Sequence, residues 1–323
     1  MRVLIDTDPA MGSLGGDPED SFALLLALSS PELTVDGITT VQGNVPVDKG
    51  YSSAVHLLSI AGRNEVPVYR GAAQPLSPAR TPQLRWLEKR AALEQVSPAA
   101  SPPDGQADAA DFMARHVLDS PGEITLITIG PLTNVALALQ RAPGFAQSVG
   151  RIVMMAGAAN VPGNVTPSAE FNIWMDPEAA AEVFASGIEI TMVGLDVCEQ
   201  THLREELLLE LSRSNSPLGQ FVGAATLPFI EWRRRVFASD DLHLYDSLAV
   251  ATAFRPEILT LEPAWVAIET VGRHTSGETV VWLNPVLREG VARNEPNALV
   301  GLSLDSDAFE TLFEQRVIAP MLE

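Results

Sequence analysis

The sequence has few cations, a single cysteine and no long apolar run. Its 323 residues carry 21 Lys and Arg against 41 Asp and Glu, a formal net charge of −20. This excess of negative charge argues against nucleic acid or an anionic membrane as a partner, because either would be repelled. One cysteine, Cys198, excludes an internal disulfide framework and is typical of a reducing compartment. Met1 leads directly into a strand-like segment, so we expect no leader peptide, no membrane span and a cytoplasmic location.

Strand-like and helix-like segments alternate along most of the chain, which is typical of an α/β protein. We expect a single domain over residues 1–323, with an open, mostly parallel, Rossmann-like sheet, helices on both faces and additional C-terminal helices. The predicted strands are Val3–Thr7, Thr34–Thr40, Ile124–Ile129, Arg151–Met155 and Glu189–Val193. The predicted helices are Asp20–Leu28, Val47–Ala61, Ala107–Leu118, Leu132–Leu139 and Pro177–Ala185.

The last third of the chain departs from this alternation. Its pattern predicts two helices, Pro217–Arg235 and Asp246–Phe254, and a terminal helix from about Asp305 to Ile318. Between them, Ala264–Glu269 and Glu278–Leu283 are typical of a hairpin pair.

Residues 72–106 form a proline-rich insertion. Six prolines interrupt it: Pro75, Pro78, Pro82, Pro98, Pro102 and Pro103. A connection this long inside a compact domain is usually a lid, a binding loop or disordered. We expect a lid or active-site loop containing a short helix, Arg85–Glu94, and the alternative is a passive surface insertion.

Acidic side chains gather between the first strand and the first helix. Asp6 and Asp8 follow the apolar run Val3–Ile5, and Asp17, Glu19 and Asp20 precede an unbroken apolar helix. Carboxylates placed between two buried elements repel one another unless a cation or a shared proton neutralises them. The carboxyl end of a parallel strand is also where open α/β sheets bind ligands. The pattern therefore predicts a Ca²⁺ or Mg²⁺ site in an active-site cleft.

Four further polar motifs follow strands or open helices. They are GITTVQGN (37–44), GPLTN (130–134), GN…AEFN (163–172) and YDSLAVA (245–251). Together with DTD…DPED (6–20), this ordered set closely resembles the inosine–uridine type nucleoside hydrolases over roughly residues 1–285. The resemblance implies an α/β enzyme that hydrolyses the N-glycosidic bond of ribonucleosides to ribose and free base. It also implies one Ca²⁺ per subunit and a homodimer or homotetramer.

The resemblance assigns roles to individual residues. Asp8 would be the general base that activates a Ca²⁺-bound water. The metal ligands would be Asp8, Asp20, Asp246 and the backbone carbonyl of Ile129. The ribose would be bound by Glu19, Asn164, Glu170 and Asn172, with Asn44 close by, Met155 against the sugar and Phe171 within the same motif.

Two residues depart from the family pattern. Glu19 stands where most members have Asp, and Tyr245 stands where several have a His that protonates the leaving base. A tyrosine hydroxyl is a poorer acid at neutral pH, so we expect aromatic stacking to help activate the base. The candidates for stacking are Trp86, Phe229, Trp232 and Tyr245, which gives a modest lean toward purine nucleosides.

His243 and the run Arg233 to Arg235 lie near these aromatics in the sequence, and we expect neither to belong to the site. His243 is a substitute acid only if it faces the site, and strand alternation predicts that it points elsewhere. Arg233 to Arg235 are expected to form a solvated or salt-bridged helix face.

Two other functions are compatible with parts of the pattern. Asp-x-Asp after a strand also opens the haloacid-dehalogenase phosphatases, but Ala10 stands where that family wants Thr or Val, and AEFN and YDSLAVA stay unexplained. A catalytically weak nucleoside- or ribose-binding homologue is the other alternative, and Tyr245 and Glu19 are what motivate it.

Overall fold

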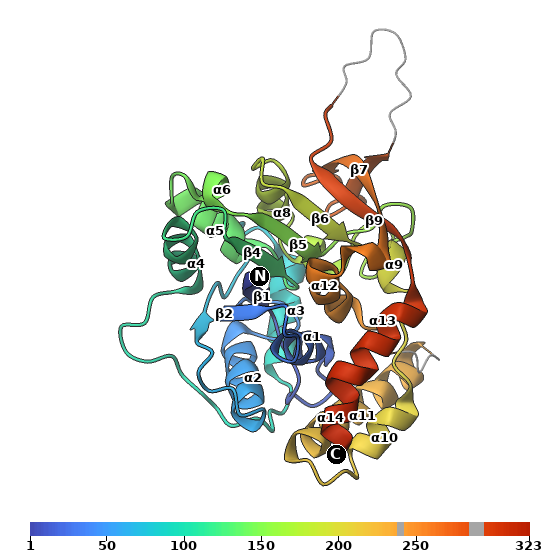
Figure 1. The fold of residues 1–323 in the computed structure, drawn as a ribbon. Helices are drawn as coiled ribbons and strands as arrows, with labels where there is room; N and C mark the ends of the chain where they lie inside the picture. The colour runs from blue at the N-terminus through green and yellow to red at the C-terminus, as the bar shows by residue number, and fades with distance from the viewer. Residues whose placement is uncertain (238–241, 284–293) are drawn as a thin grey trace.

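The computed structural model describes residues 1–237, 242–283 and 294–323. Its centre is one mixed sheet whose strands lie in the order β3-β2-β1-β4-β5-β6-β9-β7-β8 (Figure 1). Neighbours from β3 through β9 are parallel, whereas β7 runs antiparallel to both β9 and β8. The strands are β1 Arg2–Thr7, β2 Thr34–Thr40, β3 Val68–Arg70, β4 Ile124–Thr128, β5 Arg151–Met155, β6 Ile190–Val193, β7 Leu259–Ile268, β8 Thr279–Leu283 and β9 Ala298–Leu304.

Alternating apolar residues send side chains to both faces of the sheet. In β1, Val3 and Ile5 join one core cluster while Leu4 joins the other. The first cluster is covered by α1 Glu19–Leu28, α2 Val47–Ile60, α9 Leu195–Cys198, α10 Glu205–Leu211, α11 Pro217–Phe237, α12 Tyr245–Phe254 and α13 Ser306–Phe313. The second is covered by α4 Ala109–Leu118, α5 Thr133–Arg141, α6 Phe145–Ser148 and α8 Pro177–Phe184. Figure 1 shows these two helical layers on opposite sides of the sheet.

The predicted fold class is confirmed, and the first five predicted strands and the five helices predicted between them agree with the structure to within about two residues. The predicted hairpin pair is also present as β7 and β8, but β7 begins at Leu259 and not at Ala264. The prediction missed two strands. β3 has only three residues, and β9 pairs with β6 and β7, which are distant from it in sequence. In the proline-rich insertion, the helix α3 spans Thr81–Ala91, earlier than predicted, because Pro82 is tolerated in its first turn. The remaining elements are α7 Phe171–Met175, η1 Pro256–Ile258, η2 Glu314–Ile318 and α14 Ala319–Leu322, so the terminal helix continues past Ile318 through a π-helical turn. Within the described ranges, none of the helices combines the length and apolar character needed to cross a bilayer.

The strand order reverses beside β1, which lies between β2 and β4. In open α/β sheets, ligands bind outside the carboxyl ends of the strands at such a switch point. The chain segments that leave this edge are those starting at Asp8, Val41 and Ile129.

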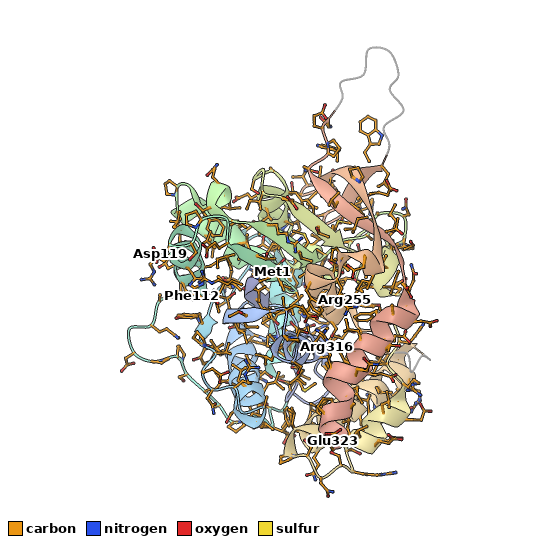
Figure 2. All side chains as sticks on the ribbon, viewed as in Figure 1. Met1, Phe112, Asp119, Arg255, Arg316 and Glu323 are labelled. Carbon is orange, nitrogen blue, oxygen red and sulfur yellow. The ribbon has the colours of Figure 1, made fainter. Side chains whose placement is uncertain are left out.

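A partly exposed ion pair connects the C-terminal helices with the N-terminal half of the chain. Figure 2 labels Arg316 on the C-terminal helices. Arg316 donates two hydrogen bonds to the Glu32 carboxylate, at 2.7 and 2.8 Å, and its guanidinium lies 5.1 Å from the centre of the Phe254 ring. The hydrogen bonds from Arg316 lower the pKa of Glu32 from 4.5 to about 2. The Glu32 side chain is 36% exposed, so solvent screens much of this interaction.

Glu32→Gln is expected to lower the free energy of unfolding at pH 7 by about 0.5–1 kcal/mol. Because the pKa of Glu32 is depressed in the folded state, its contribution is present above pH 4.5 and is lost as the pH falls toward 2. Urea unfolding of both proteins should therefore show a gap that narrows below pH 4.5. Glu88→Gln, on the exposed face of α3, is the matched control and should show no gap; an equal gap at all pH values would contradict this assignment.

Candidate active site

Three acids from distant parts of the chain converge at the switch point. Asp8 follows β1 directly, Asp20 lies in the first turn of α1 and Asp246 lies in the first turn of α12. Asp8 and Asp20 are fully buried, and Asp246 is 6% exposed. Because β1, α1 and α12 are apolar and buried, the carboxylates at their ends are buried with them.

Short hydrogen bonds fix two of these carboxylates. Asp20 Oδ1 accepts from the Thr7 hydroxyl and from the backbone N–H of Asp8 at 2.9 Å. The backbone N–H of Asn44 donates to Asp8 Oδ2 at 2.6 Å, and Asn44 Nδ2 donates to Asp20 Oδ2 at 3.1 Å. Asp8 Oδ1 is buried and has no hydrogen-bond partner among the described residues. Asp8 is therefore held by one oxygen and presents the other.

The charges of these acids oppose one another. Burial raises the pKa of Asp8 and of Asp246 well above their ordinary value, and neighbouring carboxylates raise both further. Burial also raises the pKa of Asp20, to about 6, against the hydrogen bond from Thr7. The cluster cannot carry all its negative charge in a low-dielectric site unless protons or a cation neutralise it.

The donor set fits a hard divalent cation. Its potential ligands are oxygens, and the unpartnered Asp8 Oδ1 is an orphaned buried acceptor of the kind that a cation satisfies. The Ile129 carbonyl lies on the same edge of the sheet, directly after β4. In the described part of the chain, however, no three His, Cys, Asp or Glu side chains are arranged as a complete metal-binding group.

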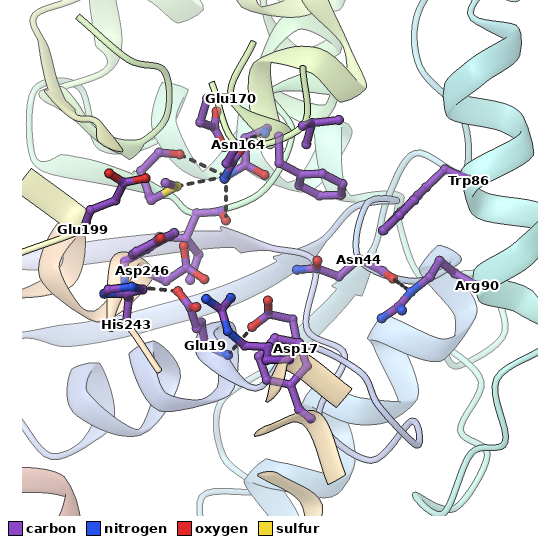
Figure 3. A pocket seen from close by; sticks show the side chains of 18 of the residues that line it. Asp17, Glu19, Asn44, Trp86, Arg90, Asn164, Glu170, Glu199, His243 and Asp246 are labelled. Carbon is purple, nitrogen blue, oxygen red and sulfur yellow. Dashed lines mark hydrogen bonds between the residues drawn. The ribbon is translucent and has the colours of Figure 1, made fainter. Parts of the chain in front are cut away.

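A cavity of about 350 Å³ lies above the acids (Figure 3). Asp8 and Asp20 lie beneath its lining, whereas every other residue predicted for the site contributes to it. The predicted residues in the lining are Glu19, Asn44, Trp86, Ile129, Met155, Asn164, Glu170, Phe171, Asn172, Phe229, Trp232, Tyr245 and Asp246. The structure thus brings together residues from both ends of the chain around one cavity.

Glu170 and Asn172 are held by local structure. Glu170 caps the short helix α7, and Asn172 lies inside it. The Glu170 carboxylate accepts from the backbone N–H groups of Gly157, Asn172 and Ile173, at 2.8 to 3.1 Å. Asn172 Nδ2 donates to the carbonyl oxygens of Ile129 at 3.2 Å and Met155 at 3.0 Å. Asn172 therefore links the ends of β4 and β5.

Aromatic rings form the outer wall of the cavity. Trp86 meets Phe171 edge to face at 5.6 Å, and Phe229 stacks on Trp232 at 5.7 Å. A base-sized planar ligand can lie against such a wall while its sugar faces the acids.

Comparison with known proteins identifies the family of this chain. The family model for inosine-uridine preferring nucleoside hydrolases matches residues 3–311. The chain belongs to this nucleoside hydrolase family. It is accordingly a ribonucleoside hydrolase, and the haloacid-dehalogenase alternative has no support.

The relatives of this nucleoside hydrolase differ in their named specificity. A pyrimidine-specific ribonucleoside hydrolase of Shewanella woodyi is 36% identical, over 97% of this chain and 96% of the relative. A non-specific ribonucleoside hydrolase of Salmonella agona is 38% identical, over 96% and 95% respectively. The solved structure of a purine-preferring ribonucleoside hydrolase from Gardnerella vaginalis has a TM-score of 0.82 at 28% identity, covering 99% of both chains.

Two sequence-based interpretations of this hydrolase's site were wrong. His243 does not point away: it lines the cavity and stacks on Tyr245 at 5.3 Å, because the chain turns into α12 at Tyr245 and strand alternation ends there. For the run Arg233 to Arg235, the prediction of a solvated or salt-bridged face is wrong only for Arg233, which lines the cavity. Arg234 is exposed and forms an ion pair with Glu205 at 2.7 Å.

Several lining residues of the hydrolase were not singled out as site residues from the sequence. They are Asp17, Arg90, Val165, Glu199 and Arg233. Arg90 had a usable signal, because it lies four residues after Trp86 and so on the same face of a helix. Glu199, at the end of α9, carries no such signal.

Two glycines allow backbone to approach the Asp8 carboxylate. A Cβ built on Gly43 would lie 1.9 Å from Asp8 Oδ2, and one built on Gly130 would lie 2.7 Å from Asp8 Oδ1. A side chain at either position would clash with the carboxylate, so glycine lets both turns pack against it and restrict its orientation.

Gly43→Ala is expected to displace the Asp8 carboxylate and lower kcat/KM about 10²-fold, because small misplacements of reacting groups are costly. Overpacking should also cost about 1–3 kcal/mol of stability, which a thermal melt would show. Gly50→Ala is the matched control: its Cβ would lie 3.5 Å from the Pro9 carbonyl oxygen, an ordinary van der Waals contact, so full activity is expected. A fully active Gly43→Ala protein would contradict the proposed constraint.

Proposed function

We propose that this chain hydrolyses ribonucleosides to ribose and free base with Asp8 as general base and with one Ca²⁺ held by Asp8, Asp20, Asp246 and the carbonyl oxygen of Ile129. The observation that carries the proposal is the cluster of mutually repelling, buried carboxylates beneath the cavity. Bound Ca²⁺ would neutralise these acids, lower the pKa of a water molecule and bind sugar hydroxyls.

Asp8 is placed to take a proton from the attacking water. Asn44 fixes its Oδ2, which leaves Oδ1 as the oxygen that accepts. Cleavage of a ribose–base bond passes through a sugar cation, and the surrounding acids stabilise this developing charge. Water attacks opposite the departing base, so inversion at the anomeric carbon is expected.

The ribose would be bound by polar side chains around the cavity. Glu19 is held for this role by the backbone N–H of Tyr245, which donates to Glu19 Oε2 at 3.1 Å. We assign the remaining ribose contacts to Asn44, Asn164, Glu170 and Asn172, with Met155 against the sugar.

The leaving base would lie among aromatic rings. Burial raises the pKa of Tyr245, so its hydroxyl keeps its proton and cannot donate it readily at neutral pH. We therefore assign Tyr245 to stacking, together with Trp86, Phe171 and Trp232, and retain the lean toward purine nucleosides because a larger ring system gains more from such a wall.

His243 is proposed to protonate the leaving base. Its ordinary pKa lies near neutrality, unlike those of the other described lining residues. Its Nδ1 lies 2.7 Å from the carbonyl oxygen of Thr201, a contact that fixes Nδ1–H as the donor and makes Nε2 the titrating nitrogen.

We also expect assembly into a homodimer or homotetramer, which the family resemblance supports, and a cytoplasmic location, which the single cysteine supports.

The direct test is a panel of inosine, adenosine, uridine and cytidine, with ribose measured as reducing sugar and the base by chromatography. We expect turnover of purines above pyrimidines, loss of turnover with a chelator and recovery when Ca²⁺ is restored. Asp8→Asn should lose at least about 10²-fold in kcat, whereas Asp119→Asn, exposed at the end of α4, should behave as wild type. Tight nucleoside binding by calorimetry without any product would favour the binding homologue instead.

His243→Gln tests the leaving-group assignment. With inosine we expect kcat to fall by about 10²–10³-fold, because the departing base needs a proton. With p-nitrophenyl β-D-ribofuranoside, whose leaving group departs unprotonated, kcat should stay near wild type. Equal losses on both substrates, or none on inosine, would show that His243 does not supply the proton.

A further inference from the structure

The helix α3 binds the turn that holds the catalytic carboxylates. Trp86 Nε1 donates to the carbonyl oxygen of Gly43 at 3.0 Å, and Arg90 Nε donates to the carbonyl oxygen of Asn44 at 2.7 Å. Figure 3 shows Arg90 beside Asn44, with this hydrogen bond drawn between them. On its other side, the same turn holds Asp8 through the Asn44 N–H and Asp20 through the Asn44 amide.

The Arg90 guanidinium is fixed from several directions. It lies 5.4 Å from the centre of the Trp86 ring, and its Nη2 lies 3.5 Å from the carbonyl oxygen of Gly15 in the loop after β1. Asp17, on the same loop, interacts favourably with its charge. A planar group with several donors in fixed directions suits this place better than a flexible ammonium would.

We propose that Arg90 is a positioning residue for hydrolysis: it holds the Gly43–Asn44 turn so that Asn44 keeps Asp8 and Asp20 in their working orientation. This inference rests on the proposed role of Asp8. The Asn44 carbonyl and N–H belong to adjacent peptide groups of one short turn, so a shift at the carbonyl moves the N–H that holds Asp8. A displacement of the order of 1 Å at a reacting group costs about 10²-fold in rate.

The effect of removing Arg90 should stay local, because other bonds hold the same segment. The backbone N–H of Leu14 donates to the Glu94 carbonyl at 2.8 Å, and that of Val96 donates to the Gly12 carbonyl at 2.7 Å. Before α3, the N–H of Leu76 donates to Asp176 at 2.8 Å. We therefore expect α3 to remain in place when Arg90 is replaced.

The experiment compares Arg90→Ala, Arg90→Gln and Arg90→Lys with Lys89→Ala, an exposed neighbour on the same helix. With the best nucleoside of the panel, we expect kcat to fall about 10–10²-fold in all three Arg90 variants while KM changes less than threefold. Arg90→Lys should lose nearly as much as Arg90→Gln, because the bond depends on the guanidinium geometry and not on charge alone. Added guanidinium should restore kcat of Arg90→Ala severalfold, an effect that a general loss of folding would not show.

Three results would overturn the proposal. A raised KM with unchanged kcat would make Arg90 a substrate contact, and a wild-type Arg90→Lys would make its charge beside Asp17 the important feature. Losses that follow thermal stability in every variant, without rescue by guanidinium, would reduce Arg90 to a packing role. Asp8→Asn measured alongside separates the two claims: if it stays active, the proposed role of Asp8 fails whatever the Arg90 variants do.

Discussion

Repulsion between buried carboxylates is the constraint on which the rest of the site depends. Asp8, Asp20 and Asp246 reach one solvent-free place from three elements, and burial and mutual repulsion favour their protonated forms. Such a cluster destabilises the folded state unless a cation or protons neutralise it. Hydrogen bonds from Thr7 and Asn44 to the carboxylate oxygens of Asp8 and Asp20 restrict the orientation of these two side chains.

The part of the site that the sequence could reveal lies at strand ends. Asp8 and Ile129 directly follow the apolar strands β1 and β4, and Asn44 lies in the turn after β2; parallel strands bring their carboxyl ends to one edge. The pairing of β9 with β6 and β7 depends on contacts far apart in sequence, so no local pattern announced it. The capping role of Glu170 and the stacking of His243 on Tyr245 are local contacts, but they depend on backbone turns that the hydrophobic pattern does not reveal.

The floor and the wall of the cavity are built differently. The floor comes from strand ends and helix starts within the core, where backbone N–H groups hold the carboxylates of Asp8, Asp20 and Glu170. The wall comes from the proline-rich insertion and from α11, which contribute Trp86 and Trp232. Side chains on an insertion and a surface helix can change without disturbing the sheet. Relatives of this chain are named for pyrimidine-specific, non-specific and purine-preferring activity.

The central claim, that a divalent cation compensates the buried acids, is tested most directly by calorimetric titration of the metal-free protein with Ca²⁺ in buffers of different ionisation enthalpy. Because the pKa values of Asp8, Asp20 and Asp246 are raised, the metal-free cluster retains protons that a cation must displace. The account predicts one Ca²⁺ per chain with net proton release at pH 6, and loss of both in Asp246→Asn. Absence of Ca²⁺ binding would contradict this expectation. So would Ca²⁺ binding that releases no protons and that is unchanged in Asp246→Asn.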